Sequence, residues 1–274
     1  MAKKRILYVS QEITPYLPAS ELSKTARHLP QAMNESGKEV RLFMPRFGCI
    51  NERRHQLHEV IRLSGMNLII NDMDQPLIIK VASVPQARMQ VYFIDNEEYF
   101  KRKETVTDKE GNFFADNDER AMFFCRGVLE TVKKLGWAPD VIHCHGWMAS
   151  LLPAYLKKFY SDDPTFAKSK IVFSVYNEPF EGSLGDALAS KLEFDGFDKE
   201  TLELYKEPNF INLNKAAIKN VDAVIKGSED LTTDLEDIIK EAKLPTLEFA
   251  AQENYKEMYG AFYDELLVEE TVAK

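Results

Sequence analysis

Apolar residues occur along the chain in two patterns, as short continuous runs and as series spaced three and four positions apart. Short apolar runs rich in β-branched residues predict buried strands, at residues 5–10, 39–44, 141–143, 171–175 and 223–226. Between and after them, apolar side chains spaced three and four positions apart predict helices, at residues 20–36, 116–135, 147–160, 210–220 and 229–243. Ser228 stands before the last of these helices as its predicted N-cap. This order of elements predicts an α/β fold with a mostly parallel sheet.

The alternation of strands and helices is interrupted between residues 54 and 95. Strand-like runs joined by short turns occupy this stretch, at residues 60–63, 67–70, 77–81 and 90–94. We interpret it as a β-meander inserted into a doubly wound, Rossmann-like sheet, and not as a second domain.

The last stretch of the chain differs from the rest, because its apolar side chains are mostly aromatic. Those that recur at helical spacing are Tyr255, Met258, Tyr259, Phe262 and Leu266. Such a stripe indicates a helix that docks on the rest of the molecule through this face. We therefore expect residues 1–243 to form an α/β domain and residues 244–274 to add a helix packed on it.

Charge and cysteine content exclude several classes of protein. The 274 residues include 35 Lys+Arg and 44 Asp+Glu, a formal net charge of −9, which counts against binding nucleic acid through bulk positive charge. No apolar run approaches the ~20 residues of a membrane span. Cys49, Cys125 and Cys144 are too scattered for a disulfide framework or a cysteine metal site. We expect a cytoplasmic protein without nucleic-acid or membrane partners.

Three segments follow predicted strands, where ligands bind in an open parallel sheet. The first, from Gln11 onward, lacks G-x-G-x-x-G because the only glycine before residue 48 is Gly37, which counts against a dinucleotide dehydrogenase. The second runs from Val141 to Trp147, and the third ends in Asn177 and Glu178. Since the fold brings such strand ends together, we expect all three to line a common crevice.

His143 and His145, two residues apart at a strand end, leave several interpretations open. The pair can bind a metal ion, as in a metal-dependent hydrolase, although any further ligand would have to be a carboxylate because no histidine follows residue 145. One histidine can instead contact a ligand. The third interpretation is that His143 only hydrogen-bonds within the sheet.

The same three segments, in this order, resemble the N-terminal catalytic domain of bacterial glycogen synthases and plant starch synthases (glycosyltransferase family 5). The family's E-x-x-P-[FY] is matched by Glu12, Pro15 and Tyr16, and its H-x-H-D-W by the run that ends in His145 and Trp147. Its H-N motif is matched at Asn177, with Tyr176 in place of the histidine. The resemblance covers about residues 4–240 and implies one half of a GT-B fold, in which two Rossmann-like halves face a cleft.

The resemblance also implies roles for individual residues. It makes His145 the candidate catalytic contact. The candidate substrate-binding residues are Glu12, Tyr16, Trp147, Tyr176 and Asn177. Among them, the rings of Tyr16, Trp147 and Tyr176 can stack on sugar faces at the crevice. No metal and no cofactor are expected.

Four further positions depart from the family's motifs. Pro18, Ser20 and Glu21 stand where the family has the lysine and two glycines of K-x-G-G-L, which contact the nucleotide sugar and the growing chain, and Gly146 replaces the aspartate of H-D-W. The lysine's charge is lost, and an acid at a phosphate turn repels a diphosphate. These changes count against binding of ADP-glucose or UDP-glucose by this half.

The family has a second domain, which binds the nucleotide sugar and carries further catalytic residues, whereas this chain resembles only the first half. Its last helix resembles the family's crossover helix. The resemblance implies glucosyl transfer from a sugar nucleotide to an α-1,4-glucan, and we expect the isolated half to be inactive unless a partner chain supplies the other half. A non-catalytic module that binds glucan or a partner is the alternative, and the metal-dependent hydrolase is a second one.

Overall fold

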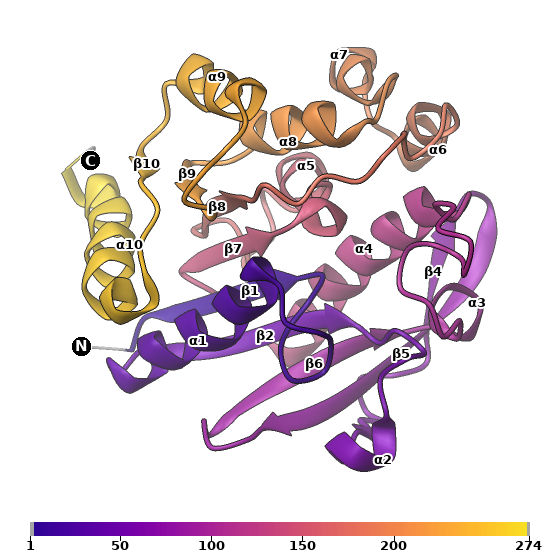
Figure 1. Ribbon diagram of the computed structural model, residues 1–274, viewed down its shortest axis with the longest axis horizontal. Coiled ribbons are helices and arrows are strands. Elements are labelled where there is room, and N and C mark those ends of the chain that lie inside the picture. The colour runs from indigo at the N-terminus through magenta and orange to yellow at the C-terminus, as the bar shows by residue number, and fades with distance from the viewer. Residues whose placement is uncertain (1–2, 273–274) are drawn as a thin grey trace.

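A computed structural model of the chain describes the backbone of residues 3–272 and the side chains of residues 3–268. Its strands are β1 (Arg5–Ser10), β2 (Glu39–Pro45), β3 (His58–Glu59), β4 (Met66–Ile70), β5 (Met73–Val84), β6 (Met89–Asp95), β7 (Val141–His145), β8 (Lys170–Val175), β9 (Ala223–Lys226) and β10 (Thr246–Leu247). They follow the order β10-β9-β8-β7-β1-β2-β6-β5-β3, with β4 paired to β5 (Figure 1).

The sheet confirms the doubly wound, mostly parallel prediction. β1 pairs in parallel with both β2 and β7, so the strand order reverses between β1 and β7. β6 also belongs to the parallel part, because it pairs with β2, and only then does β5 run antiparallel to β6. The predicted meander is therefore an extension of the main sheet.

The strand predicted at residues 60–63 is wrong. The carbonyl of Val60 accepts hydrogen bonds from the amides of Leu63 and Ser64, so the run closes on itself as a turn. The Ser64 hydroxyl accepts a hydrogen bond from the amide of Ile79 at 3.0 Å and ties this turn to β5. Local hydrogen bonds thus replace the strand ladder that the apolar pattern predicts.

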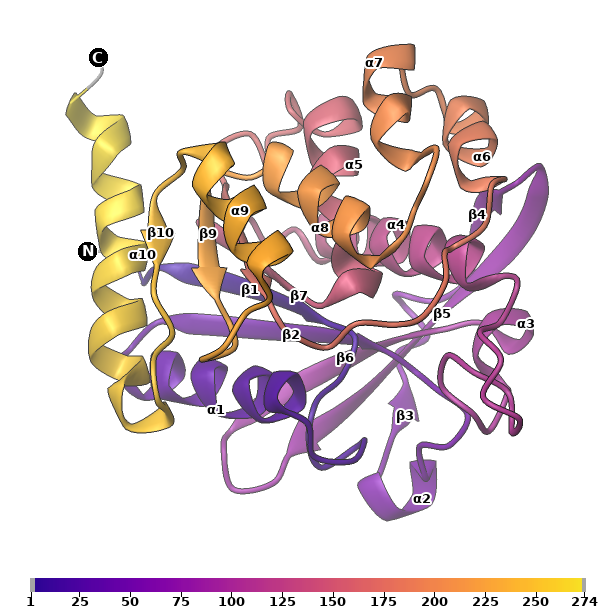
Figure 2. The same cartoon turned by 45° about the horizontal axis from the view of Figure 1, so that its top comes forward.

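Helices cover both faces of the sheet. They are α1 (Glu21–Glu35), α2 (Glu52–His55), α3 (Glu97–Phe100), α4 (Asn117–Leu135), α5 (Leu152–Phe159), α6 (Leu188–Asp195), α7 (Lys199–Leu202), α8 (Phe210–Lys219), α9 (Thr233–Ala242) and α10 (Tyr255–Val272), with short 3₁₀ turns η1 (Trp147–Ala149), η2 (Glu203–Tyr205) and η3 (Gln252–Asn254). Figure 2 shows α1 on one face and α4, α5 and α8 on the other. None of the helices within residues 3–272 has the length and hydropathy to cross a bilayer.

The predicted N-cap at Ser228 is also wrong. The helix begins at Thr233 with Thr232 as its N-cap. The Ser228 hydroxyl is already engaged, because it accepts a hydrogen bond from the amide of Asn177 at 3.0 Å and donates one to the Glu21 carboxylate. The side chain that the local pattern predicts as a cap forms long-range hydrogen bonds instead.

Four residues of the aromatic stripe of α10 are buried, as its pattern predicts, and Met258 is partly buried against the core. Tyr255, Tyr259, Phe262 and Leu266 face the body, and α10 packs against α1 at the left edge of the molecule in Figure 1. Tyr263, which the stripe did not include, is fully buried as well. The division of the chain at residue 243 stays a prediction, and residues 273–274 of its second part lie outside the described residues.

Candidate functional site

The carboxyl ends of β1, β7 and β8 meet at the point where the strand order reverses. Ser10 pairs with His145, and His145 pairs with Ser174 on the next strand. This is where a doubly wound sheet places its ligands. The loops that leave these three strands therefore define the candidate site.

The N-terminus of α1 lies over these strand ends and is occupied by the chain's own carboxylates. Ser20 caps the helix through a capping box with Ser23. The backbone amide of Leu22 donates a hydrogen bond to Oε1 of Glu178 at 3.2 Å, and the Ser20 hydroxyl donates one to Oε2 of Glu12 at 2.9 Å. The free amides and the positive end of the helix dipole attract an anion here. Glu178 supplies that anion from within the chain.

We call the group formed by Glu12, Ser20, Glu21, Leu22 and Glu178 the α1 entrance. Burial raises the pKa of Glu178, and the charges of Glu12 and Glu21 raise it further against the opposing hydrogen bond from Leu22. Three carboxylates around one helix end make this region unfavourable for a second anion.

The two histidines lie behind the α1 entrance, in the core. Both ring nitrogens of His143 are within hydrogen-bond distance of a hydroxyl, Nδ1 at 2.7 Å from Tyr263 and Nε2 at 2.7 Å from Ser174. The contact with Ser174 of β8 matches the interpretation in which His143 bonds within the sheet, whereas Tyr263 belongs to α10. Nδ1 of His145 lies 2.8 Å from the Tyr176 hydroxyl, and its Nε2 is buried without a partner among the described residues.

Burial favours the neutral form of both imidazoles. Burial lowers the pKa of His145 to about 3, and burial together with the nearby His145 lowers the pKa of His143 well below its usual value. Nε2 of His145 does not reach a surface, because the side chain has no solvent exposure. The candidate catalytic residue is thus a buried group that contacts Tyr176.

The three rings predicted to stack on sugars are buried in the structure. Tyr16, Trp147 and Tyr176 are 5%, 4% and 2% exposed. Trp147 packs against Phe113 and Phe180. Tyr16 donates its hydroxyl hydrogen to the carbonyl of residue 83 at 3.3 Å. Aromatic character at a strand end did not distinguish a ring that fills the core from one that lines a surface.

Gly227 allows the ring of Tyr176 to pack closely against the backbone. A Cβ at Gly227 would lie 2.6 Å from the ring of Tyr176, closer than side chains approach one another. Gly146 is similarly constrained, with a φ of +82° and a position where a Cβ would meet Oε1 of Gln11 at 2.6 Å. That oxygen accepts a hydrogen bond from the amide of Met148, so the family's aspartate does not fit at position 146 without a local rearrangement.

The remaining two departures from the family's motif lie at the surface. Pro18 is exposed, and its carbonyl accepts a hydrogen bond from the Ser23 hydroxyl at 3.1 Å. Ser20 is the N-cap described above. Both residues therefore stabilise the start of α1.

An open groove of about 510 Å³ lies beside the α1 entrance, between the loop that follows β8 and the starts of α8 and α9. We call it the β8–α8 groove. Its lining residues are Asn177, Pro179, Phe180, Gly182, Asn209, Phe210, Ile211, Asn212, Thr232 and Asp234. Among the predicted site residues, only Asn177 lies in it.

The side chains of the β8–α8 groove are ordered by local contacts. Asn209 caps α8 by accepting a hydrogen bond from the amide of Asn212 at 2.9 Å, and the Asn212 side chain donates to the carbonyl of residue 207 at 2.7 Å. Phe180 stacks on Phe113 and meets Phe210 edge-on. The side chain of Asn177 is exposed, while its backbone amide is held by Ser228. Sequence reasoning missed Phe180, Asn209 and Asn212 as site residues, although Asn209 follows Pro208 in an N-cap pattern.

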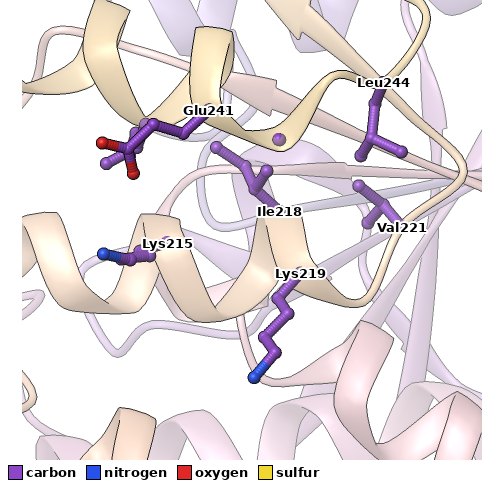
Figure 3. Close-up of a pocket in the computed structure, with 8 residues that line it drawn as sticks. Lys215, Ile218, Lys219, Val221, Glu241 and Leu244 are labelled. Atoms are coloured by element: carbon purple, nitrogen blue, oxygen red, sulfur yellow. The ribbon is translucent and has the colours of Figure 1, made fainter.

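A smaller cavity of about 300 Å³ lies between α8 and α9, at the amino ends of β9 and β10 (Figure 3). Its wall includes the apolar side chains of Ile218, Val221 and Leu244, with Lys215 and Lys219 from α8 at its rim. It lies at the opposite edge of the sheet from the polar strand ends. We therefore do not assign the candidate site to it.

The geometry does not favour the metal-dependent hydrolase. Both nitrogens of His143 face hydroxyl groups. Among the side chains of residues 3–268, no three of the His, Cys, Asp or Glu type are grouped so that they could hold a metal ion.

Three comparisons with known proteins agree with one another. The family described as "Starch synthase catalytic domain" matches residues 5–242. A glycogen synthase of Chlorobium luteolum is 38% identical over 229 residues, which cover 82% of this chain and 46% of that protein. A glycogen synthase of Chlorobium limicola is 42% identical over 189 residues, covering 69% of this chain and 39% of that protein. The chain thus spans about half the length of the curated relatives it matches, or less.

The fold is shared with a solved structure, the catalytic domain of starch synthase IV from Arabidopsis thaliana bound to ADP and acarbose. The TM-score is 0.74 at 19% identity, over 92% of this chain and 53% of that one. At this identity the likeness shows the fold, which is the α/β half of a GT-B arrangement.

Proposed function

Because the chain belongs to the starch synthase catalytic domain family, we propose that it provides the acceptor side of a glucosyltransferase and holds an α-1,4-glucan in the β8–α8 groove. The observation that carries the proposal is this groove, open and about 510 Å³ in volume, at the carboxyl edge of the sheet. It combines phenyl rings with amide side chains. Rings match the apolar faces of a sugar, and amides both donate to and accept from its hydroxyls.

The glucosyl donor would be held elsewhere than at the α1 entrance. Glu178 already accepts from the amide of Leu22, the amide that a phosphate would use. The ADP and acarbose in the starch synthase IV structure support a nucleotide and an oligosaccharide as ligands of the family. We propose that ADP-glucose or UDP-glucose binds mainly to a nucleotide-binding half outside this sequence, on the same or a partner polypeptide, and that transfer takes place in the cytoplasm.

Four of the other predicted site residues would act as positioning residues. His145 contacts the Tyr176 hydroxyl, and Tyr176 immediately precedes Asn177 in the groove. Glu12 accepts a hydrogen bond from the hydroxyl of Ser20, the N-cap of α1, and so positions the start of that helix. The buried ring of Trp147 packs edge-on against Phe180. In this proposal Asn177 contacts the sugar, whereas His145, Tyr176 and Trp147 fix the groove.

Calorimetric titration with maltoheptaose tests the proposal. We expect saturable binding at a millimolar or lower dissociation constant, and about tenfold weaker binding by the Asn177→Ala variant, because an exposed amide that anchors a sugar hydroxyl is lost. Asn67→Ala is the matched control, since Asn67 is an exposed asparagine of β4 outside the groove. Absence of binding at about 10 mM maltoheptaose, or equal affinity of the Asn177→Ala variant, would contradict the proposal.

A further inference from the structure

A second polar pocket lies at the amino edge of the sheet, opposite the carboxyl edge that carries the β8–α8 groove. Its volume is about 450 Å³, and it lies where β2 and β6 begin and where the turn after β5 approaches α1. The lining residues used below are Asn34, Glu39, Arg41, Arg88, Gln90 and Tyr92. We call it the amino-edge pocket.

Arg41 is held in this pocket by aromatic rings and not by a carboxylate. Its guanidinium carbon lies 4.8 Å from the ring centre of Trp137 and 5.8 Å from that of Tyr92. Nη1 is buried and has no acceptor among the described residues. Rings stabilise the charge of a guanidinium, but they leave its in-plane N–H donors unsatisfied, and a buried donor without an acceptor is costly. Among the described residues, Nη1 of Arg41 therefore has no hydrogen-bond acceptor.

Arg88 adds a second positive charge. It lies in the turn between β5 and β6 with a φ of +46°, is exposed, and has no ion pair among the described residues. The one carboxylate of the lining, Glu39, is engaged: it accepts from Nε1 of Trp137 at 2.6 Å and lies 3.3 Å from Nε of Arg5. In a chain of net charge −9, one pocket is thus lined by two arginines that pair with no carboxylate in the described part of the chain.

We propose that the amino-edge pocket binds a phosphate monoester, with Arg41 and Arg88 on the phosphate. Planar guanidinium groups match the oxygens of a phosphate, and two of them neutralise its charge. The amides of Asn34 and Gln90 line the same pocket and are suited to hydroxyl groups of the esterified part. Its volume exceeds what a bare phosphate ion fills, so the ligand is a hydroxylated ester such as a sugar monophosphate. This proposal does not depend on glucan binding in the β8–α8 groove.

Titration with glucose 6-phosphate, inorganic phosphate and glucose, followed by amide chemical shifts, tests the assignment. We expect the ester to bind, with shifts in the turn at residues 84–89, inorganic phosphate to bind at least about tenfold more weakly, and glucose not to bind. Equal affinity for ester and inorganic phosphate would overturn the assignment to an ester. Failure of both anions to bind at about 10 mM would overturn the site.

Two variants and a control locate the binding. Arg88→Gln and Arg41→Gln are each expected to weaken ester binding about tenfold or more. Arg88 is exposed in a turn, so its variant folds even if Arg41→Gln does not. Arg62→Gln, at an exposed position outside the pocket, leaves the affinity unchanged. Unchanged affinity of the Arg88→Gln variant would overturn the proposal.

Discussion

The α1 entrance and the β8–α8 groove lie next to each other at the carboxyl edge of the sheet, yet they differ in charge and in free space. At the α1 entrance, three glutamates surround one helix end, and Glu178 accepts from its amide. The groove is open, with a volume of about 510 Å³, and its lining includes one carboxylate, Asp234, among amides and rings. The comparison teaches that a carboxylate of the chain itself satisfies the helix end at the α1 entrance, whereas the neighbouring groove stays open.

Ser228 connects the two regions. Its hydroxyl donates to Glu21 in the α1 entrance and accepts from the amide of Asn177 in the groove. A change at the end of β9 is therefore expected to disturb both regions, while changes confined to one glutamate or one amide separate them.

The largest effect is expected from Gly227→Ala. The added methyl group would lie 2.6 Å from the Tyr176 ring, which must leave its contact with His145, so we expect a loss of about 3 kcal/mol in the free energy of unfolding. Urea denaturation measures it. Gly260→Ala is the matched control, because the nearest atom to a Cβ there is 4.0 Å away and alanine favours a helix. Equal stability of the two variants would show that the ring is not held as described.

A smaller effect is expected from acid, with opposite signs for the buried His145 and for Glu178 of the α1 entrance. The folded-state pKa of His145 is about 3 against 6.5 for the free side chain. The stability that depends on its neutral form is therefore complete above about pH 6.5 and is lost as the pH falls. Between about pH 7.5 and about pH 5 we expect a loss of about 2 kcal/mol from this residue. Glu178 acts in the other direction, because its raised pKa favours the protonated form in the folded state.

The pH dependence of urea unfolding, compared between the wild-type chain and His145→Asn, measures this contribution. Asparagine keeps a polar group towards Tyr176 but does not titrate in this range. We expect a flatter profile for the variant between about pH 7.5 and about pH 5. Parallel profiles would mean that protonation of His145 does not cause the loss of unfolding free energy in acid.

The sequence predicts those parts of the fold that depend on local period. The runs that became β1, β2 and β7, and the aromatic stripe of α10, need only the pattern of neighbouring residues. The strand predicted at residues 60–63 fails because local hydrogen bonds to Val60 close a turn. Ser228 fails as a cap because partners far along the chain claim its hydroxyl.

The candidate site was less predictable than the fold, for the same physical reason. The hydrogen bond from Leu22 to Glu178 joins residues 156 positions apart, and no local pattern encodes such a contact. Likewise, the sequence does not distinguish whether an aromatic residue after a strand, such as Tyr16 or Trp147, is buried or exposed. Its burial depends on tertiary contacts. The sequence identified the acid at position 21 but not its hydrogen-bond partner, Ser228.

The central claim is that the chain's own carboxylates exclude a diphosphate from the α1 entrance while the groove stays open to glucan. Calorimetric titration of the wild-type chain and of the Glu21→Gln, Glu178→Gln double variant with ADP and with maltoheptaose tests it most directly. We predict that the double variant binds ADP at least about tenfold more tightly than the wild-type chain, because two like charges are removed, with maltoheptaose affinity unchanged. Equal ADP affinity of the two proteins, or tight ADP binding by the wild-type chain, would contradict the account.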